Sequence, residues 1–432
     1  MISDIRIPLR TPVPRLSLLV LAASVLLPAG QACGSEKAML DLVSHAVAVH
    51  PAVRVAEREM AASESDKAGA RWQRYPTPSF VSQTPSQSSG SSNAQTVNRV
   101  VIEQPVFAGG GIDANIDAAD ARYKSGMARY RQVEQETAIR LLNTWYEWRR
   151  HAGRQNILQQ SVDAHRKLRD QIQRRFKEGV SPEADLALAE ARLSQTQSEF
   201  SQAQSAARAA YAQLVQLAGP ELPRFGDSVL GNWAAEANSY LLPPGDWRQR
   251  SIATAPQLQK LSADEEAAEA DIRVKRAVLV PTIKLRYEND LSAPQYPGSR
   301  ERFFIALNAQ PGAGFSALSG IEAARARRDS VIESKRNALL ELEQALEIDL
   351  ADHLAARDRM EVAKLLIRST MDVTESYSRQ FVAGRKSWLD VLNSVREAVS
   401  ARLSVADAQA LLGQTWWRLR IRALGLSPHS ES

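Results

Sequence analysis

The chain has 432 residues, one cysteine and a formal net charge of +5. Its Lys and Arg side chains are spread along helical stretches rather than gathered in one basic tract, which argues against a nucleic-acid partner, and the lone Cys33 excludes an intrachain disulfide. The six histidines are scattered, and none stands at metal-ligand spacing from a cysteine or a carboxylate, so we expect no enzyme, no cofactor and no metal site.

Residues 1–32 have the pattern of a secretory signal peptide. A basic stretch precedes an apolar run over 16–27, and the small residues at 30–32 suit a cleavage site. The apolar run is too short to span a bilayer comfortably, which argues against an uncleaved anchor. Cys33 would then stand at the mature N-terminus, either as an inert thiol or as a site of lipid modification. No later apolar run approaches 18 residues, so we expect no membrane-spanning helix in the mature chain.

The first half of the chain predicts helices on both sides of a strand pair. Helical spacing of apolar residues predicts a helix over 37–73 that breaks at His50-Pro51. A stretch rich in Pro, Ser and β-branched residues then predicts two strands, at about 77–84 and 96–106. Residues 111–218 follow as a long helical hairpin.

The second arm of this hairpin has apolar or small residues at every third or fourth position. They are Leu186, Ala189, Leu193, Thr196, Phe200, Ala203, Ala207, Ala210, Leu214 and Leu217. This heptad spacing predicts a helix packed along 111–178, and its many alanines allow the two backbones to approach closely. At the turn, Gly179 suits the end of the first helix, Ser181 the N-cap of the second and Pro182 its first helical position.

The same order of elements then begins again. Pro51 and Pro76 are 25 positions apart, as are Pro256 and Pro281. The second half predicts strands at about 282–290 and 302–310 and a helical hairpin over 320–424 that turns at Gly384. The predicted division of the chain is a signal peptide at 1–32, a first repeat at 33–225, a connector at 226–245, a second repeat at 246–427 and a tail at 428–432.

The predicted strands have one apolar and one polar face. Ile283, Leu285 and Tyr287 alternate with charged residues, and the fourth strand repeats the alternation less cleanly. No other predicted strand could cover the apolar face in a soluble sandwich, whereas in a membrane barrel this face would meet lipid. Four strands are too few to close a barrel. The sequence therefore predicts an oligomer, with a dimer giving eight strands and a trimer twelve.

Three segments resemble the TolC family of outer-membrane channel-tunnels, also called outer membrane efflux proteins. They are QPVFAGGGIDANIDAADARY after a strand, RRFKEGVSPEADLALAEARL at the first turn and SRQFVAGRKSWLDVLNSVREA at the second. The resemblance covers about 38–427. It implies a mainly α fold with a membrane β-barrel, in which a homotrimer forms a twelve-stranded barrel in the lipid of the outer membrane and a twelve-helix coiled-coil tunnel in the periplasm of a Gram-negative bacterium.

The resemblance also implies a function. Such a protein is a passive exit duct that works with a periplasmic adaptor protein and an inner-membrane transporter of the ABC or RND type. The segment LNAQPGAGFSALSGIEAARARRD resembles the branch that serves type I secretion of large adhesins. Drug-efflux members have similar turns, so small-molecule efflux stays open. A non-conducting structural coiled-coil protein of the envelope is a further alternative.

The two hairpin turns are the predicted functional sites. Asp185 and Asp390 each stand six residues after a turn glycine, so a symmetric tube would carry rings of these carboxylates. They could equally be ordinary carboxylates at a helix N-terminus. The resemblance places them in a periplasmic constriction and the turns at the adaptor. The predicted gate residues are Asp185, Phe381, Lys386, Asp390 and Asn393, and the predicted docking residues are Gly179, Val180, Ser181, Gly384 and Arg385.

The predicted gate departs from the family pattern at three positions. Phe381 stands where the family has Tyr, Lys386 where it has Arg, and Asn393 where a second acid is frequent. Phe381 cannot make the hydrogen bond of a Tyr hydroxyl, and Lys386 lacks the bidentate geometry of Arg. An ion pair between Lys386 and Asp185 is what remains, and we expect it to hold the gate closed only weakly.

Overall fold

The computed structural model describes residues 29–84, 96–219, 244–292, 300–310 and 312–426. The first half contains α1 (Ala29–Val49), α2 (Pro51–Trp72), β1 (Thr77–Gln83), β2 (Val97–Phe107), α3 (Gly111–Lys177) and α4 (Glu183–Ala218). The second half contains α7 (Pro244–Thr254), α8 (Pro256–Ala277), β3 (Thr282–Asp290), β4 (Glu301–Asn308), a single 3-10 turn (Ala313–Phe315), α9 (Ser316–Val382) and α10 (Trp388–Leu424). The signal peptide up to residue 28, most of the predicted connector and the predicted tail lie outside these residues.

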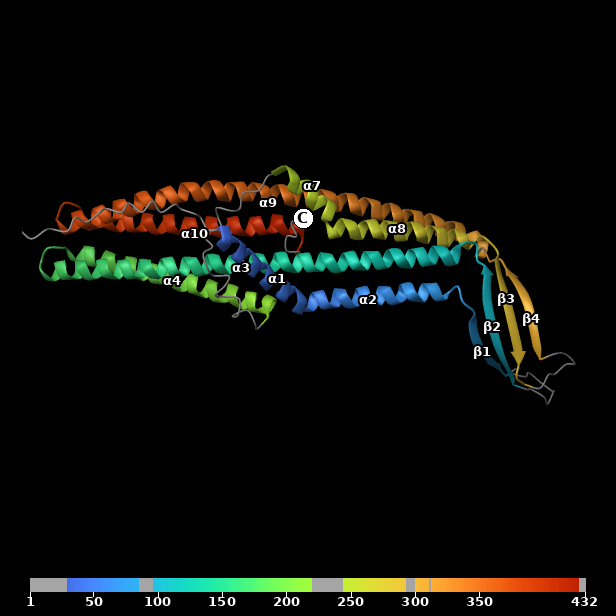
Figure 1. The fold of residues 1–432 in the computed structure, drawn as a ribbon. Helices are drawn as coiled ribbons and strands as arrows, with labels where there is room; N and C mark the ends of the chain where they lie inside the picture. The colour runs from blue at the N-terminus through green and yellow to red at the C-terminus, as the bar shows by residue number, and fades with distance from the viewer. Residues whose placement is uncertain (1–28, 85–95, 220–243, 293–299, 311, 427–432) are drawn as a thin grey trace, which may run out of the picture.

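The helices run along one long axis, and the sheet lies at one end of it (Figure 1). α3 and α9 each have 67 residues, a length of about 100 Å. α2 and α8 accompany the halves of these helices nearer the sheet, and α4 and α10 accompany the other halves (Figure 1). Both hairpin turns therefore lie at the end away from the sheet. The described elements thus occur twice in the same order, mostly as helices.

The breaks at the two prolines follow from local chemistry. His50 separates α1 from α2, and its Nδ1 accepts a hydrogen bond from the Ala52 N–H at 3.2 Å, while Pro51 takes the first helical position, where no N–H is needed. In the second half, Ala255 separates α7 from α8 ahead of Pro256 without a side-chain cap. The sequence analysis predicts no helix before Pro256, whereas the structure has α7, most of which lies after the predicted end of the connector at residue 245.

The four strands form one antiparallel sheet in the order β1-β2-β3-β4. The central pair, β2 with β3, joins the two halves of the chain. Its register places Leu285 opposite Gln104 and Arg286 opposite Glu103, so the predicted alternation is present. One face collects Phe80, Val100, Ile102, Ile283, Leu285, Tyr287, Phe303, Ile305 and Leu307. We call this the apolar sheet face, and the opposite side the polar sheet face.

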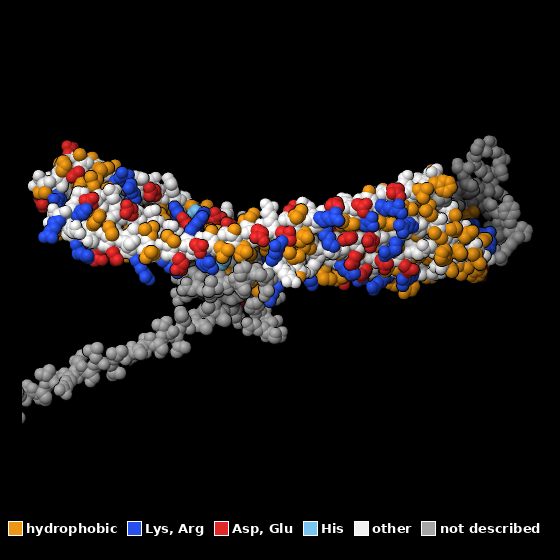
Figure 2. Space-filling model, turned by 90° about the horizontal axis from the view of Figure 1, so that it is seen from above, with side chains coloured by type: hydrophobic (Ala, Val, Ile, Leu, Met, Phe, Trp, Pro, Cys, Tyr) orange, Lys and Arg blue, Asp and Glu red, His pale blue; other side chains and the backbone are white. Residues whose placement is uncertain are grey.

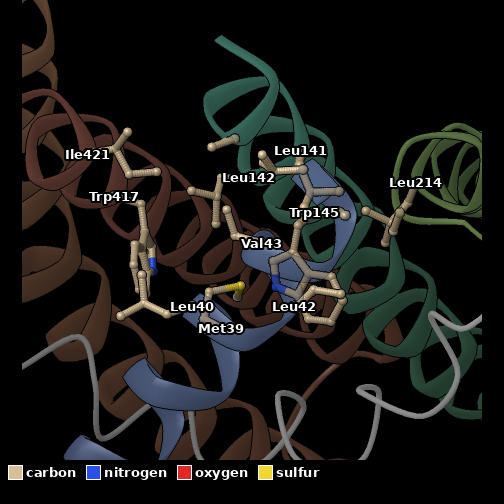
Figure 3. Packing of buried hydrophobic residues seen from close by; sticks show 14 of the residues in the cluster. Met39, Leu40, Leu42, Val43, Leu141, Leu142, Trp145, Leu214, Trp417 and Ile421 are labelled. Atoms are coloured by element: carbon tan, nitrogen blue, oxygen red, sulfur yellow. The ribbon is translucent and has the colours of Figure 1, made fainter. Parts of the chain in front are cut away.

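The main hydrophobic core lies at mid-length, where α1 crosses the long helices (Figure 3). Leu42 and Val43 of α1 are fully buried against Leu142 and Trp145 of α3 and Trp417 of α10. Full burial of each such side chain stabilises the fold by about 1.5–3 kcal/mol. This core fixes the N-terminal helix and the end of α10 to the centre of α3.

The predicted α3–α4 seam is observed with small differences. Ala189, Leu193, Ala203 and Leu214 are buried along α4. At the end of the helix, Ala218 is buried in place of the predicted Leu217, which is half-buried. The small side chains let α4 lie close to α3, as the seam predicts.

A buried ion cluster joins α9 to α10 near the centre. Asp349 of α9 is 4% exposed and pairs with Arg418, at 2.9 Å, and with Arg422 of α10. Burial raises the pKa of Asp349, and the two arginines lower it, so the desolvation of the carboxylate is only partly offset. The cluster fixes the end of α10 against α9 through charge as well as packing.

Close approach of α10 to α3 predicts a site that cannot tolerate a side chain. A Cβ at Gly413 would overlap the ring of Tyr146 at its Cε1 atom. We expect Gly413→Ala to lower stability by about 1–3 kcal/mol through overpacking, measured as thermal unfolding of the detergent-solubilised protein.

The matched control for this substitution is Gly69→Ala. Gly69 lies in α2 with open space around its Cα, so the same change should be neutral or stabilising, because Ala favours helix. Equal unfolding temperatures for Gly413→Ala and the unmodified chain would contradict the packing.

The hairpin turns as a candidate gate and docking site

The two turns have the same backbone geometry. Gly179 and Gly384 have φ values of 75° and 71°, a left-handed conformation that glycine adopts without strain. In the first turn the Gly179 N–H donates to Phe176 O and the Val180 N–H to Arg175 O. The second turn repeats both bonds, from Gly384 to Phe381 O and from the next N–H to Gln380 O. Each is a Schellman motif, which satisfies the last carbonyls of the long helix.

The helices after the turns begin differently. Ser387 caps α10 through a capping box: its Oγ accepts from the Asp390 N–H, and the Asp390 carboxylate accepts from the Ser387 N–H, both at 3.2 Å. α4 begins at Glu183 with Pro182 as N-cap and no side-chain cap. The predicted N-cap at Ser181 and first helical position at Pro182 were therefore wrong by one residue. The Ser181 N–H still belongs to the turn, because it donates to Arg175 O.

A small apolar cluster holds the two turns together. Phe381 is 7% exposed and packs with Trp388 and Leu392 of its own hairpin and with Ile172 and Ala189 of the other. The Arg175 guanidinium lies 5.2 Å from the centre of the Phe381 ring. Arg175 also accepts the turn hydrogen bonds through its carbonyl, so one residue links both turns. Phe381 thus contributes by packing, as the missing hydroxyl predicts.

Lys386 has partners within its own hairpin. Its Nζ lies 3.8 Å from an oxygen of Asp390 and 4.4 Å from the centre of the Tyr377 ring. The expected ion pair with Asp185 is absent from the described protomer, where Lys386 is already paired with the acid four residues later. Tyr377 was missed by the sequence interpretation, although it precedes Phe381 by four residues and therefore shares its helix face.

The two acids differ in their surroundings. Asp185 and Asp390 are both half-buried in the first turns of their helices. Asp390 is held by the capping box and faces Lys386, whereas Asp185 forms no ion pair within the described ranges. Asn393 is exposed one turn further along α10. Within those ranges no three His, Cys, Asp or Glu residues are placed to hold a metal ion.

The docking residues lie on the surface of the turns. Gly179, Val180, Gly384 and Arg385 are exposed, and Ser181 is half-buried. Their surface is partly apolar, because Val180 is 59% exposed and Val382, two residues before Gly384, is 77% exposed. The turns thus offer a protruding, partly apolar rim at the end of the molecule opposite the sheet.

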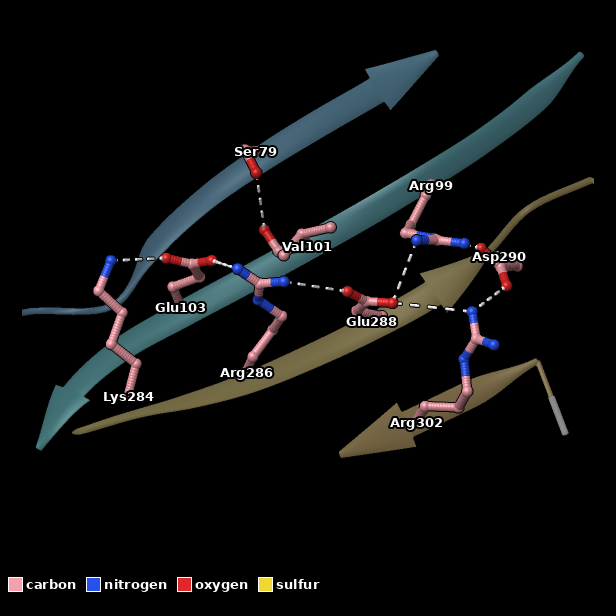
Figure 4. A network of polar contacts seen from close by, with 9 residues as sticks. All are labelled: Ser79, Arg99, Val101, Glu103, Lys284, Arg286, Glu288, Asp290 and Arg302. Carbon is pink, nitrogen blue, oxygen red and sulfur yellow. Dashed lines mark hydrogen bonds and ion pairs between the residues drawn. The ribbon is translucent and has the colours of Figure 1, made fainter. Parts of the chain in front are cut away.

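At the other end, the polar sheet face carries a continuous ion network (Figure 4). Glu103 pairs with Lys284 at 3.1 Å and with Arg286. Glu288, 7% exposed, faces three arginines from three strands, and Asp290 pairs with two of them. The arginines around these two acids are Arg99, Arg286 and Arg302. Every charge of the network has an opposite charge beside it, so the face is polar but nearly neutral.

Both halves of the chain match the same family of known proteins. Residues 42–220 and 247–425 each match the family described as outer membrane efflux proteins. None of the described helices is both long enough and apolar enough to cross a membrane.

Individual relatives are distant but cover most of the chain. Protein CyaE of Bordetella pertussis is 24% identical over 394 residues, which are 85% of this chain and 80% of CyaE. The open-state structure of the outer membrane channel MtrE of Neisseria gonorrhoeae is 15% identical, with a TM-score of 0.76 over 91% of each chain. The outer membrane protein VceC of Vibrio cholerae is 14% identical, with a TM-score of 0.73 over 90% of this chain and 96% of VceC. At these identities the structures show a shared fold.

The capping box predicts a local difference between the two turns. Ser387→Ala should cost about 0.5–2 kcal/mol at the start of α10 and accelerate amide hydrogen exchange over residues 388–395. Ser181→Ala is the matched control, because α4 begins without a side-chain cap. If both substitutions changed exchange equally, the capping box would not be what orders the second turn.

Proposed function

Because the chain belongs to the outer membrane efflux protein family, we propose that it is the outer-membrane exit duct of a tripartite export system. It passively conducts substrate from an inner-membrane transporter and a periplasmic adaptor to the exterior. The observation that carries this proposal is the two-faced sheet at the end of a very long helical bundle. Its apolar face is exposed in the protomer, with Ile305 at 79% and Leu307 at 70%, while its other face is charged.

The open sheet supports a trimeric assembly. β1 and β4 are the edge strands, and their outer backbone groups have no partner strand in the order β1-β2-β3-β4. Pairing β4 of one protomer with β1 of the next satisfies both edges, and three copies give a twelve-stranded barrel of a size that encloses a lumen. The apolar sheet face then meets lipid, and the ion network of the polar sheet face lines the lumen.

The turns are the proposed gate and docking site in this arrangement. The helices extend about 100 Å from the sheet, so the turns form the periplasmic rim where an adaptor would bind Gly179, Val180, Ser181, Gly384 and Arg385. Asp185, Phe381, Lys386, Asp390 and Asn393 lie at this rim and would form the constriction. Because Lys386 faces Asp390, a ring of Asp390 carboxylates is partly neutralised, and its cation selectivity is weaker than that of an unpaired ring.

For the cargo, we favour type I secretion of a large adhesin over small-molecule efflux. The support is the segment LNAQPGAGFSALSGIEAARARRD at the start of α9, which resembles the secretion branch. Deleting the gene should remove the adhesin from the cell surface and leave drug susceptibility unchanged. Increased susceptibility with normal surface adhesin would favour the efflux alternative.

The proposed duct predicts that the protein is a trimer and that the trimer conducts ions. The purified protein should cross-link as a trimer in detergent and conduct ions in planar bilayers. A stable monomer with folded β structure, or inserted trimers that never conduct under any voltage, would contradict the proposal.

Two neighbouring residues of β4, Ile305 and Ala306, allow a controlled test of whether the apolar sheet face meets lipid. Ile305→Arg would place a charge on the lipid side at a cost of about 2–4 kcal/mol per copy at the bilayer midplane, and should reduce assembly in the outer membrane. Ala306→Arg puts the same charge on the polar sheet face and should leave insertion intact. A soluble protein would tolerate the exposed Ile305→Arg at least as well.

The weak gate predicts a change in resting conductance. Lys386→Glu places a like charge beside Asp390 and removes the contact with Tyr377, so it should raise resting conductance in planar bilayers several-fold. Lys386→Arg keeps the charge and should behave like the unmodified protein. Each wet ion pair contributes only about 0–1 kcal/mol, so high salt should reduce the difference. Identical conductance in Lys386→Glu and Lys386→Arg would place the gate elsewhere.

A further inference from the structure

All four junctions between a helix and a strand carry large apolar side chains that are exposed in the protomer. Trp72 is the last residue of α2 and Tyr75 follows it, and their ring centres lie 5.2 Å apart. The other three junctions carry Val106 and Phe107 at the end of β2, Val278, Leu279 and Val280 after α8, and Phe315 and Leu318 after β4. We call these residues the junction collar. Exposure of this kind at every junction indicates a common partner outside the protomer.

The backbone conformation of Phe315 also supports a partner outside the protomer. Its φ of 60° makes it the only non-glycine residue with a positive φ in the described ranges. Such a conformation is strained and persists where the surroundings favour it. Its side chain is 64% exposed, so contacts within the protomer do little to offset the strain. A contact of the exposed ring outside the protomer would help to offset it.

The collar continues the apolar sheet face toward the helices. Phe107 pairs with Ile283 in the sheet register and therefore lies on that face. Figure 2 shows apolar side chains gathered at the sheet end of one side of the molecule, next to a stretch of helix with dense charges. The surface thus changes from apolar to charged at the level of the junctions.

The nearest charges to the collar without a partner are basic. Arg71 in the last turn of α2, and Lys275 and Arg276 in the last turn of α8, are exposed and form no ion pair within the described ranges. Neighbouring arginines differ, since Arg74 pairs with Asp113 and Arg273 pairs with Asp117. A favourable position near a helix C-terminus accounts for part of this pattern. The three cations are exposed at the level of the collar and are therefore free to bind an anion that the protomer does not supply.

We propose that the junction collar lies in the interface of a phospholipid bilayer and that Arg71, Lys275 and Arg276 bind the phosphate groups of anionic phospholipids there. Aromatic rings are favoured at the boundary of headgroups and acyl chains, and basic side chains beyond them attract anionic headgroups. This inference rests on the proposed function, because it requires the sheet to lie in a membrane. It adds a lipid site and sets the depth of the protein in the leaflet that faces the helices.

A second copy of the chain is a weaker candidate for the partner. Contacts between copies through the sheet would involve its edge strands, β1 and β4. Collar residues also occur where the central strands β2 and β3 meet their helices, at Phe107 and Val280. A bilayer surrounds the whole sheet and therefore accounts for all four junctions.

The lipid site can be tested on the full-length protein in detergent micelles. Adding dioleoylphosphatidylglycerol should raise the unfolding temperature more than adding dioleoylphosphatidylcholine. The triple variant Arg71→Gln, Lys275→Gln, Arg276→Gln should lose most of this extra shift. A control triple, Arg54→Gln, Arg58→Gln, Arg208→Gln, makes the same change of net charge at exposed, unpaired positions away from the collar and should keep it. Equal shifts in the two triple variants would overturn the phosphate site.

The depth of the junction collar in the bilayer can be measured in a separate experiment. In a Cys33→Ser background, spin labels at Phe315→Cys and Tyr75→Cys in liposomes should be accessible to oxygen and protected from a water-soluble nickel chelate. A label at Glu64→Cys, on exposed α2 further from the sheet, should show the opposite. Nickel access at both collar sites would overturn the bilayer assignment of the collar.

The experiments distinguish a wrong lipid site from a wrong proposed function. If the triple variant conducts normally in planar bilayers while both triples keep the lipid shift, the duct stands and the lipid site is wrong. If even the unmodified protein fails to insert or conduct, the proposed function itself is wrong.

Discussion

Pairing of β2 with β3 is the interaction on which the arrangement of the two halves depends. Each half supplies two strands at the end of its helices, and only this central pair connects them within the sheet. Ion pairs across it, from Glu103 to Lys284 and from Arg99 to Asp290, add charge to the backbone ladder. At the far end of α3 and α9 the halves meet again through Phe381 and its neighbours. The bundle is therefore held at both ends and at the mid-length core.

A sheet with two unpaired edges and one apolar face is incomplete in a single chain. The protomer satisfies its charged face by itself, since Glu288 is buried among arginines of its own chain. It leaves Ile305 and Leu307 exposed on the other face. This division fits the proposed assembly, in which the charges that one chain neutralises would line the lumen and the apolar side chains that it leaves exposed would face lipid.

Much of this fold could be predicted from the sequence because it depends on local and periodic signals. Gly179 and Gly384 marked the turns, the alanine-rich seam marked α4, and alternation marked the two faces of β3. The start of α4 was missed by one residue, because the Schellman turn extends to Ser181 and no local pattern shows where it ends. The contacts of Lys386 within its own hairpin could not be predicted, because the sequence does not show that its Nζ lies over the Tyr377 ring and near the capped Asp390. The expected pair with Asp185 stays a prediction for the assembly of several chains.

The equal length of α3 and α9 has a consequence for how such a chain can change. Because both helices start at the sheet and have 67 residues, the two turns end at the same level. An insertion of three helical turns in one of them alone would push its turn about 16 Å beyond the other and separate Phe381 from Ile172. A level rim survives only when both repeats lengthen or shorten together, by whole turns that keep the seams in phase. The duplication thus couples the evolution of two segments that lie more than a hundred residues apart in the sequence.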